Sequence, residues 1–376
     1  MLKGIQLTLM MGPVVAVPVP KYVIDALESA QVTVSAGARS GFQLTFGLSK
    51  NSKLQTDLIP AGFFSPFIRV ILMVTLGGIP NVIFDGVITK QDVTASNDPA
   101  QSKLTITGED LSVMMDLVDL TGLFSYPAMP VPAVLLVILA KYAGFGVAPL
   151  VIPPILSFVD PPTEKIAHHK GTDLTMINSF AKETGYVFYM IPGPVPGASI
   201  AYFGPEVRVG LPQPALSINM DASSNVESLR FSYDGLSGKT VVLLVMDPIT
   251  HKIPIPVILP NISLLKPPLA AVPAFSKKVE ILKDVAKQNP VKAALLGLSE
   301  VAGSSDAISG SGTLDVLRYG RLLGARQLVG VRGAGLNYDG LYYVKSVTHD
   351  IKRGEYKQNF TLSRDGTMPL FPKVNV

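Results

Sequence analysis

The clearest alternation of apolar and polar positions lies near the C-terminus, in two segments at 341–351 and 355–364. In the second segment the apolar side chains share one parity, and the polar side chains from Glu355 to Ser363 take the other. The residues of the apolar parity are Tyr356, Phe360 and Leu362. A period of two puts one face of a β-strand on a core and the other in solvent or against a partner. Gly354 supplies a permissive backbone between the segments, so the pattern predicts a hairpin in a barrel wall.

A block of short strands is predicted in the first third of the chain. Its strands lie at 31–35, 42–48, 67–75, 81–90 and 103–107, between clusters of Gly, Asn, Asp and Pro. A short helix fits 20–30, and the alternation of Ile5, Leu7 and Leu9 with polar residues predicts a first strand rather than a signal peptide. Strands at this spacing are typical of a small antiparallel barrel or sandwich.

The middle of the chain becomes rich in Pro from Tyr126 onwards. Helices are predicted there at 131–142 and 174–183, and short strands at 186–191 and 199–203. Thr172 or Asp173 is suited to cap the start of the second helix, and Gly185 is suited to end it. The apolar residues of that helix form one stripe, which is typical of a helix packed on a core. We therefore expect an inserted α+β domain.

Strand character resumes after residue 220. Further strands are predicted at 225–233, 239–246, 252–259 and 327–332. Helices fit 278–288, 291–296 and 313–323, and a loop of small polar residues fits 303–312. The chain thus has a strand-rich block at each end, and two similar barrels would make it a repeat of long period.

The composition favours burial of surface in partners as well as in the chain itself. Of the 376 residues, 48% are hydrophobic, 16% are charged and none is Trp, a balance that predicts an obligate oligomer. The net charge of +4, without a dense basic run, gives no support to nucleic-acid binding. The most apolar run, 133–140, is shorter than the roughly 20 residues that cross a bilayer, so no transmembrane segment is predicted. The absence of Cys excludes disulfides, zinc–thiolate sites, iron–sulfur clusters and Cys nucleophiles.

The histidines are His168, His169, His251 and His349. His168 and His169 are adjacent, so they cannot both face one metal from a regular strand, and no third ligand lies at zinc spacing. We interpret them as part of a flexible polar loop. His349 is interpreted as a barrel-wall or interface residue rather than a catalytic base, because no Ser-centred elbow accompanies it.

The other candidates for chemistry have structural explanations. Glu109 and Asp110 are neighbouring acids that do not point at a common substrate, and Asp110 is expected to cap the short helix that follows. Residues 310–315 resemble the start of a dinucleotide loop but lack its last glycine, and so do residues 333–335. Glycosylation triplets, which mean nothing without secretion, begin at Asn261 and Asn359. We therefore predict no catalytic, cofactor-binding or metal-ligating residues and no cofactor.

Three segments, in order, resemble the hub proteins of contractile tails. These are the late-control D family of phages and the related N-terminal half of VgrG spike proteins. The first segment is 82–87, with a Phe-x-Gly pattern, and then 104–111, where such hubs close the first barrel and start a helix. The second is 173–185, which is similar to the family's short helix followed by glycine and a strand. The third, 340–349 with 354–360, is similar to the family's terminal hairpin.

The resemblance implies a β-rich α+β fold with two tube-like antiparallel β-barrels, an inserted α+β domain and a helical segment. The expected domains are 1–118 for the first barrel, 119–219 for the insert, 220–260 with 313–370 for the second barrel, and 261–312 for a helical or linker insertion.

The resemblance also implies a structural baseplate hub that is not an enzyme. Three chains with two barrels each would form a ring of pseudo-sixfold symmetry, which joins a hexameric inner tube to a trimeric spike. The implied partners are two further copies, tube or tube-initiator proteins on one face, the spike on the other, and other baseplate proteins. Neither recognition of a nucleic-acid sequence nor membrane insertion is implied. Assembly is expected in the bacterial cytoplasm, as part of a phage tail, virion or contractile injection particle.

Two other functions stay open at this point. A cell-wall hydrolase carried in a tail would need paired carboxylates or a metal in a cleft, and one acidic substitution would abolish its activity on peptidoglycan. A secreted β-rich adhesin would lose its N-terminus and be a monomer. The hub instead predicts an intact Met1 region and a trimer or larger assembly.

Overall fold

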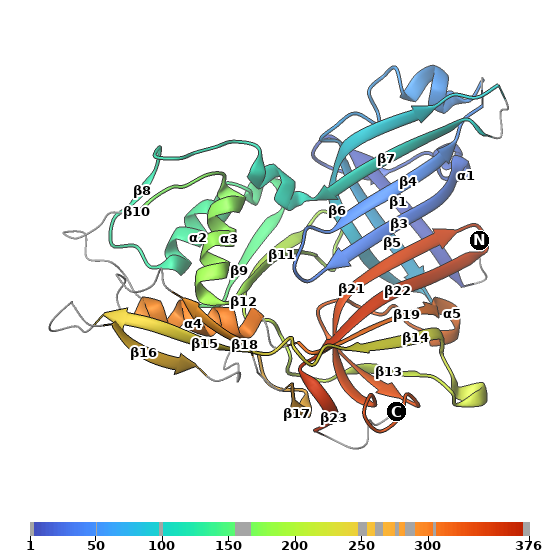
Figure 1. Cartoon of the computed structure of the whole chain (residues 1–376). Helices are drawn as coiled ribbons and strands as arrows, with labels where there is room; N and C mark the ends of the chain where they lie inside the picture. The colour runs from blue at the N-terminus through green and yellow to red at the C-terminus, as the bar shows by residue number, and fades with distance from the viewer. Residues whose placement is uncertain are drawn as a thin grey trace.

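The described residues form two strand-rich barrels, a helix-containing insert beside them and a separate small sheet (Figure 1). The structure is a computed structural model. It describes residues 4–49, 51–97, 101–154, 167–246, 254–259, 266–274, 278–282, 290–303 and 306–370. Within these residues, no helix combines the length and the apolar character needed to span a bilayer.

The first barrel is built from the N-terminal third of the chain. Its elements are β1 (Ile5–Gly12), β2 (Val17–Pro18), α1 (Lys21–Ala26), β3 (Leu27–Ser35), β4 (Gly41–Gly47), η1 (Leu54–Leu58), β5 (Arg69–Leu76), β6 (Ile79–Thr94), β7 (Lys103–Asp110) and η3 (Leu111–Asp116). Burial follows the period of two that the sequence predicted, and in β7 every second side chain is buried. The predicted strands and the short helix after Pro20 are confirmed.

The insert packs two helices against a three-stranded sheet. Its elements are β8 (Ser125–Tyr126), α2 (Val131–Ala140), η4 (Ala143–Phe145), β9 (Val147–Val151), β10 (Ala167–His168), α3 (Asp173–Thr184), β11 (Val187–Pro192) and β12 (Ser199–Gly204). Thr172 caps α3 by accepting a hydrogen bond from the Thr175 amide, and Gly185 ends it with a φ of 68°, as predicted. The apolar sides of both helices share one core with Ala201 and Phe203 of the sheet.

The second barrel comes from separated stretches of the chain. Its elements are β13 (Gln213–Ser217), η5 (Asp221–Ser223), β14 (Val226–Tyr233), β19 (Ile308–Asp315), α5 (Val316–Tyr319), β20 (Leu328–Arg332), β21 (Gly340–Lys352) and β22 (Glu355–Arg364). After it, β23 (Gly366–Pro369) pairs with β17 (Ala270–Pro273). β21 and β22 form the predicted C-terminal hairpin, in which Tyr356, Phe360 and Leu362 are buried and Gly354 turns with a φ of 82°.

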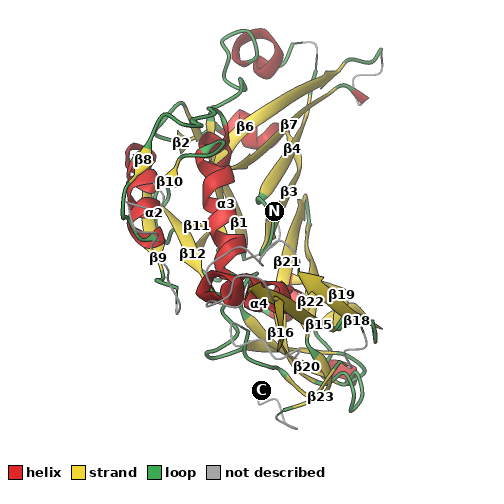
Figure 2. Cartoon of the chain, turned by 60° about the vertical axis from the view of Figure 1, so that its left-hand side comes forward, coloured by secondary structure: helices red, strands yellow, loops and turns green. Residues whose placement is uncertain are grey.

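A separate small sheet stands between β14 and β19 in the sequence. Its strands are β15 (Lys239–Met246), β16 (Pro254–Leu259) and β18 (Lys278–Leu282), and α4 (Pro290–Gly303) packs on one face through Ala293 and Val301. Figure 2 shows α4 at the foot of α3. The second barrel was expected over 220–260, but β15 and β16 lie outside it, because β15 pairs with β16 and β18 rather than with barrel strands.

Three local expectations in this region are wrong. The helix expected at 278–288 is a strand over its described part, since β18 finds a parallel partner in β15. The loop expected at 303–312 contains most of β19, in which Gly310 and Gly312 lie against the rings of Phe231 and Phe360. The helix expected at 313–323 is reduced to α5, because β19 continues to Asp315.

One sheet of 13 strands runs through both barrels. Its order is β14-β19-β22-β21-β3-β4-β7-β6-β5-β1-β2, with β20 joined to β21 and β13 joined to β20. Figure 1 shows β22, β21, β3, β4 and β7 following one another through the molecule. A single hydrophobic core lies behind this sheet and contains residues of both barrels, such as Phe46 and Tyr342.

Candidate assembly interface

The two barrels meet where β3 pairs with β21, and we call this antiparallel pairing the seam. On its exposed side, the Oγ1 atoms of Thr33 and Thr348 lie 2.9 Å apart. Beside them, Gln31 Nε2 donates a hydrogen bond to Asp350 Oδ1 at 2.8 Å. The seam is therefore a true strand pairing rather than a loose contact between domains.

The strands on the two sides of the seam are arranged alike. The order is β3-β4-β7-β6 in the first barrel and β14-β19-β22-β21 in the second. In both barrels a short helix comes next in the chain after the second strand: η1 follows β4, and α5 follows β19. A further strand then pairs with the strand that comes after it in the chain: β5 pairs with β6, and β20 pairs with β21. β3, β4, β6 and β7 thus correspond to β14, β19, β21 and β22.

A first β-bulge falls at the same place in both sets. It interrupts β3 after Leu27 and β14 after Val226, where each strand pairs with the next one in its barrel. The extra residue is Glu28 in β3 and Glu227 in β14. Because a bulge adds one residue to one strand, it marks a unique position along that strand.

A second β-bulge also falls at the same place in both sets of strands. It lies between Ile88 and Lys90 in β6 and between Val344 and Ser346 in β21, each time opposite the hairpin partner. The second bulge thus aligns Lys90 with Ser346, as the first aligns Glu28 with Glu227. The two barrels correspond residue by residue along these strands.

An ion pair is repeated at equivalent positions. Lys103 Nζ lies 3.0 Å from Glu28 Oε2, and Lys357 Nζ lies 3.0 Å from Glu227 Oε2. In both barrels the glutamate is the extra residue of the first bulge. These side chains are partly exposed, so the pairs mark the correspondence more than they stabilise the fold.

The seam joins unlike ends of two equivalent barrels. β3 stands at one end of its four-strand set, whereas β21 is the counterpart of β6, which stands at the other end. The contact is therefore head-to-tail, and a head-to-tail contact can be repeated by further copies until a ring closes.

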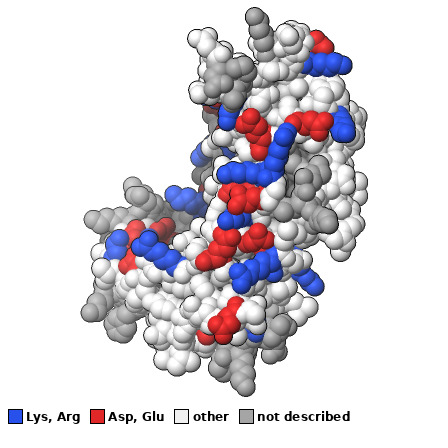
Figure 3. Space-filling view, turned by 90° about the vertical axis from the view of Figure 1, so that its right-hand side faces the viewer, with Lys and Arg blue, Asp and Glu red and all other residues white. Residues whose placement is uncertain are grey.

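One exposed face of these strands is lined by hydroxyl and amide side chains, and we call it the polar face. Over the second barrel it includes Ser228, Arg230, Ser311, Thr313, Ser346, Thr348, Asn359 and Thr361. Over the first barrel it includes Gln31, Thr33, Gln43 and Thr107. On the side of the molecule away from the insert, Figure 3 shows basic and acidic side chains next to one another rather than in separate fields.

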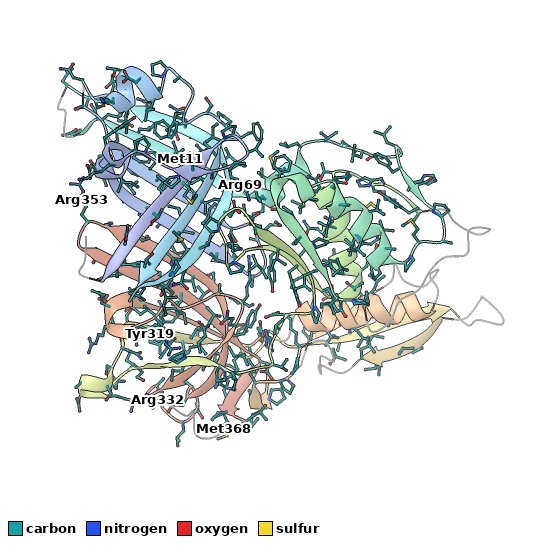
Figure 4. All side chains as sticks on the ribbon, turned by 180° about the vertical axis from the view of Figure 1, so that it is seen from behind. Met11, Arg69, Tyr319, Arg332, Arg353 and Met368 are labelled. Atoms are coloured by element: carbon teal, nitrogen blue, oxygen red, sulfur yellow. The ribbon has the colours of Figure 1, made fainter. Side chains whose placement is uncertain are left out.

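The insert is held to the first barrel by Arg69 and Asp85, whose side chains are 5% and 1% exposed. The Arg69 guanidinium donates to both carboxylate oxygens of Asp85, at 2.8 and 2.7 Å, and to the carbonyl of Gly197 at 3.1 Å. Ser199 Oγ donates to the same carboxylate at 2.8 Å. Figure 4 shows Arg69 where the barrel meets the insert.

Arg326 ties both barrels and the insert together. Its Nη2 and Nε donate to the carbonyl of Ser35 at 2.6 and 2.9 Å, and its Nη1 donates to the carbonyl of Met190 at 2.6 Å. The guanidinium lies 3.8 Å from the ring centre of Tyr189. Burial lowers the pKa of Arg326. Because Ser35 ends β3, this contact fixes one end of the seam.

A buried ion network supports the second bulge. Arg208 Nη2 lies 2.7 Å from Asp306 and 3.0 Å from Glu206, and Lys345, the extra residue of the bulge in β21, lies 2.9 Å from Asp306. Burial disfavours the charge of Arg208, but the two carboxylates outweigh it and raise the pKa of that guanidinium.

The structure corrects one histidine interpretation and supports another. His169 is fully buried, so the flexible polar loop is wrong for it, although His168 is exposed. Its Nδ1 lies 3.0 Å from the Tyr126 hydroxyl, whereas its Nε2 lies 3.5 Å from Asp173 Oδ1 without forming a hydrogen bond. His349 lies in the barrel wall at the seam, opposite Val32.

His349 is 5% exposed. Its Nδ1 is 2.7 Å from the Tyr356 hydroxyl. Burial lowers the pKa of His349 to about 4. The ring is therefore neutral at physiological pH.

The remaining sequence candidates have structural places. Asp110 caps η3 as expected, since its side chain accepts hydrogen bonds from the amides of Ser112 and Ser40; burial raises the pKa of Asp110 despite these bonds. Residues 310–315 lie in β19, and residues 333–335 lie between β20 and β21. Asn359 is on the polar face, while His251 and Asn261 lie outside the described residues.

Among the residues that the structure describes, no group of His, Asp and Glu is placed to hold a metal ion. The absence of catalytic and cofactor-binding residues stays a prediction.

The buried residues Arg69 and Arg326 were not predicted from the sequence. Arg69 and Asp85 each interrupt an apolar strand of one predicted hairpin, but only the β-bulge between Val82 and Phe84 puts both side chains on the same face. Arg326 carries no such signal, because its acceptors are backbone carbonyls from distant parts of the chain.

No protein-family model matches the sequence, and a search of curated proteins finds no match. Solved structures do match. The tail protein from Neisseria meningitidis MC58 is 14% identical, with a TM-score of 0.66 over 97% of this chain and 98% of that chain. The chain has the fold of phage tail proteins.

Two further structures widen this likeness. The 43 kDa tail protein of prophage MuSo2 from Shewanella oneidensis is 14% identical, with a TM-score of 0.61 over 96% of this chain and 99% of that chain. A chain of the Francisella PdpA–VgrG complex is 10% identical, with a TM-score of 0.60 over 100% of this chain and 55% of that chain. The expected β-rich α+β fold is confirmed, and tail proteins and a chain of the PdpA–VgrG complex share it.

Proposed function

We propose that this chain is the structural hub of a contractile tail or injection-system baseplate. Three copies form a ring in which six barrels stand around one axis. One face of the ring mates with a hexameric inner tube, and the other mates with a trimeric spike. The chain acts as an adaptor between the two symmetries rather than as an enzyme, and it assembles in the bacterial cytoplasm as part of a tail, virion or injection particle.

The head-to-tail seam carries this proposal. The two equivalent barrels of one chain already form this head-to-tail contact with each other, through β3 and β21. When a head-to-tail contact is repeated until it closes, it generates a ring. Because each chain has two equivalent barrels, a ring of three chains has six equivalent barrels around its axis. The fold likeness to tail proteins and to a chain of the PdpA–VgrG complex supports the same role.

The first test is the mass of the purified full chain in solution, measured by native mass spectrometry and light scattering. The proposal expects a species of three chains, whose averaged electron-microscopy images show six similar lobes. A monomer at every concentration, or an assembly that is not a multiple of three chains, would contradict it.

A second test addresses the non-enzymatic role. Purified peptidoglycan incubated with the chain should release no soluble fragments above a buffer control. Fragment release that one acidic substitution abolishes would replace the hub by a hydrolase.

A further inference from the structure

Two strand edges of the corresponding sets have no strand partner among the described residues. β6 pairs with β5 only as far as Val87, so residues 90–94 pair with β7 alone. β14 pairs with β19 alone. Val93 and Tyr233 on these edges are 52% and 45% exposed. An unpaired edge that exposes apolar side chains is a template for another chain.

These two edges are the counterparts of the two sides of the seam. β14 corresponds to β3, and residues 90–94 of β6 correspond to 346–350 of β21, because the second bulge aligns Lys90 with Ser346. We propose that β14 of one copy pairs with residues 90–94 of the next copy, in the register of the seam. This inference rests on the proposed ring and names the strands that close it.

The seam register can be transferred residue by residue. The pairs Ser35–Ser346, Thr33–Thr348 and Gln31–Asp350 of the seam become Asp234–Lys90, Ser232–Asp92 and Arg230–Thr94 between copies. The two bulges alone define these pairs.

The transferred register brings complementary side chains together. Lys90 faces Asp234 across the new pairing, and Asp92 stands diagonally opposite Arg230, so both contacts join opposite charges. In the single chain, Lys90 and Asp92 are exposed and pair with each other at 2.7 Å. On the other face, Val93 meets Phe231, as His349 meets Val32 in the seam. A second copy of this chain therefore fits both edges.

The test uses engineered disulfides in the full chain, which has no Cys of its own. The variant D92C/S232C places thiols at the counterparts of Thr348 and Thr33, whose hydroxyls lie 2.9 Å apart. The variant T33C/T348C is the matched positive control, since it should oxidise within one chain. The variant V93C/S232C is the register control, because its two side chains point to opposite faces.

Mild oxidation of D92C/S232C should convert the chain into a covalent trimer on a non-reducing gel, and the trimer should revert to single chains on reduction. T33C/T348C should keep the mass of one chain, and V93C/S232C should form at least tenfold less trimer. A trimer in solution whose thiols stay free, while T33C/T348C oxidises, would overturn the strand pairing and leave the proposed function intact. A chain that stays monomeric in every variant would overturn both.

Discussion

In the first barrel, Arg69 lies opposite Val87 on β6; in the second, Leu328 lies opposite Tyr343 on β21. These positions are equivalent, because the second bulge aligns Lys90 with Ser346, and Val87 and Tyr343 each stand three residues before these aligned residues.

The same count makes Leu341 the counterpart of Asp85. A buried ion pair in one barrel is thus an apolar pair in the other, in which Leu328 and Leu341 pack beside Leu269 and Ala36.

The difference follows from what lies outside each barrel. Besides pairing with each other, Arg69 donates a hydrogen bond to the carbonyl of Gly197 in the insert, and Asp85 accepts one from Ser199 of the insert. The backbone geometry of the barrel accepts either pair of side chains. The docked neighbour, and not the strand register, therefore decides which chemistry a position carries.

The largest effect on stability is expected when Arg69 alone is replaced by Leu, the residue at the equivalent position 328 of the second barrel. Arg69→Leu leaves Asp85 buried without its cation and should lower the free energy of unfolding by about 3–5 kcal/mol. The double variant Arg69→Leu with Asp85→Leu should recover most of that loss, since no buried charge remains. Denaturant unfolding of the purified chains measures both, and a single variant within about 1 kcal/mol of the parent would contradict the comparison.

The seam should also respond to pH. The folded-state pKa of His349 is about 4, against 6.5 for an unperturbed histidine. Between these two values the unfolded chain binds the proton and the folded chain does not, so the free energy of unfolding falls as pH is lowered. The shift corresponds to about 3 kcal/mol over that window.

Unfolding curves at pH 7 and pH 4 measure this loss. His349→Val places the residue of the equivalent position, Val93, in the seam, and should remove most of the pH dependence. An equal pH dependence in the parent and this variant would show that other groups cause it.

Charge reversal separates the free edges from the seam. Lys90→Asp puts two acids opposite each other in the transferred register and should weaken assembly by about 0.2–1 kcal/mol at each junction between copies. Lys90→Asp combined with Asp234→Lys should restore assembly. Sedimentation at several protein concentrations measures both, while denaturant unfolding of the single chain should be nearly unchanged.

The smallest expected effect is at the repeated ion pairs. Glu28→Gln and Glu227→Gln should each cost less than about 1 kcal/mol, because the pairs are partly exposed. Similar losses in both barrels are expected, and high salt should reduce them. A loss several times larger in one barrel would show that the two bulges are not equivalent in energy.

Much of the fold could be predicted from local patterns. The C-terminal hairpin, the strands of the first barrel and the capped helix α3 were all found, because each element carries its own period, turn or cap. The second barrel was less accessible. Strand β19 could not be predicted from its sequence, because Gly310 and Gly312 have low strand propensity. The structure explains why glycines occur in this strand, since Gly310 lies against the ring of Phe231 and Gly312 lies against the ring of Phe360.

The sequence by itself determined where strands alternate, where they turn and where a helix begins, since these depend on neighbours a few residues away. Tertiary structure alone decided that β3 pairs with β21 across some 300 residues of chain. It also decided that Glu28 corresponds to Glu227, and that Arg326 reaches three parts of the molecule. The physical reason is that strand pairing and burial depend on partners that no local pattern specifies, because any strand with the right alternation can pair with any other.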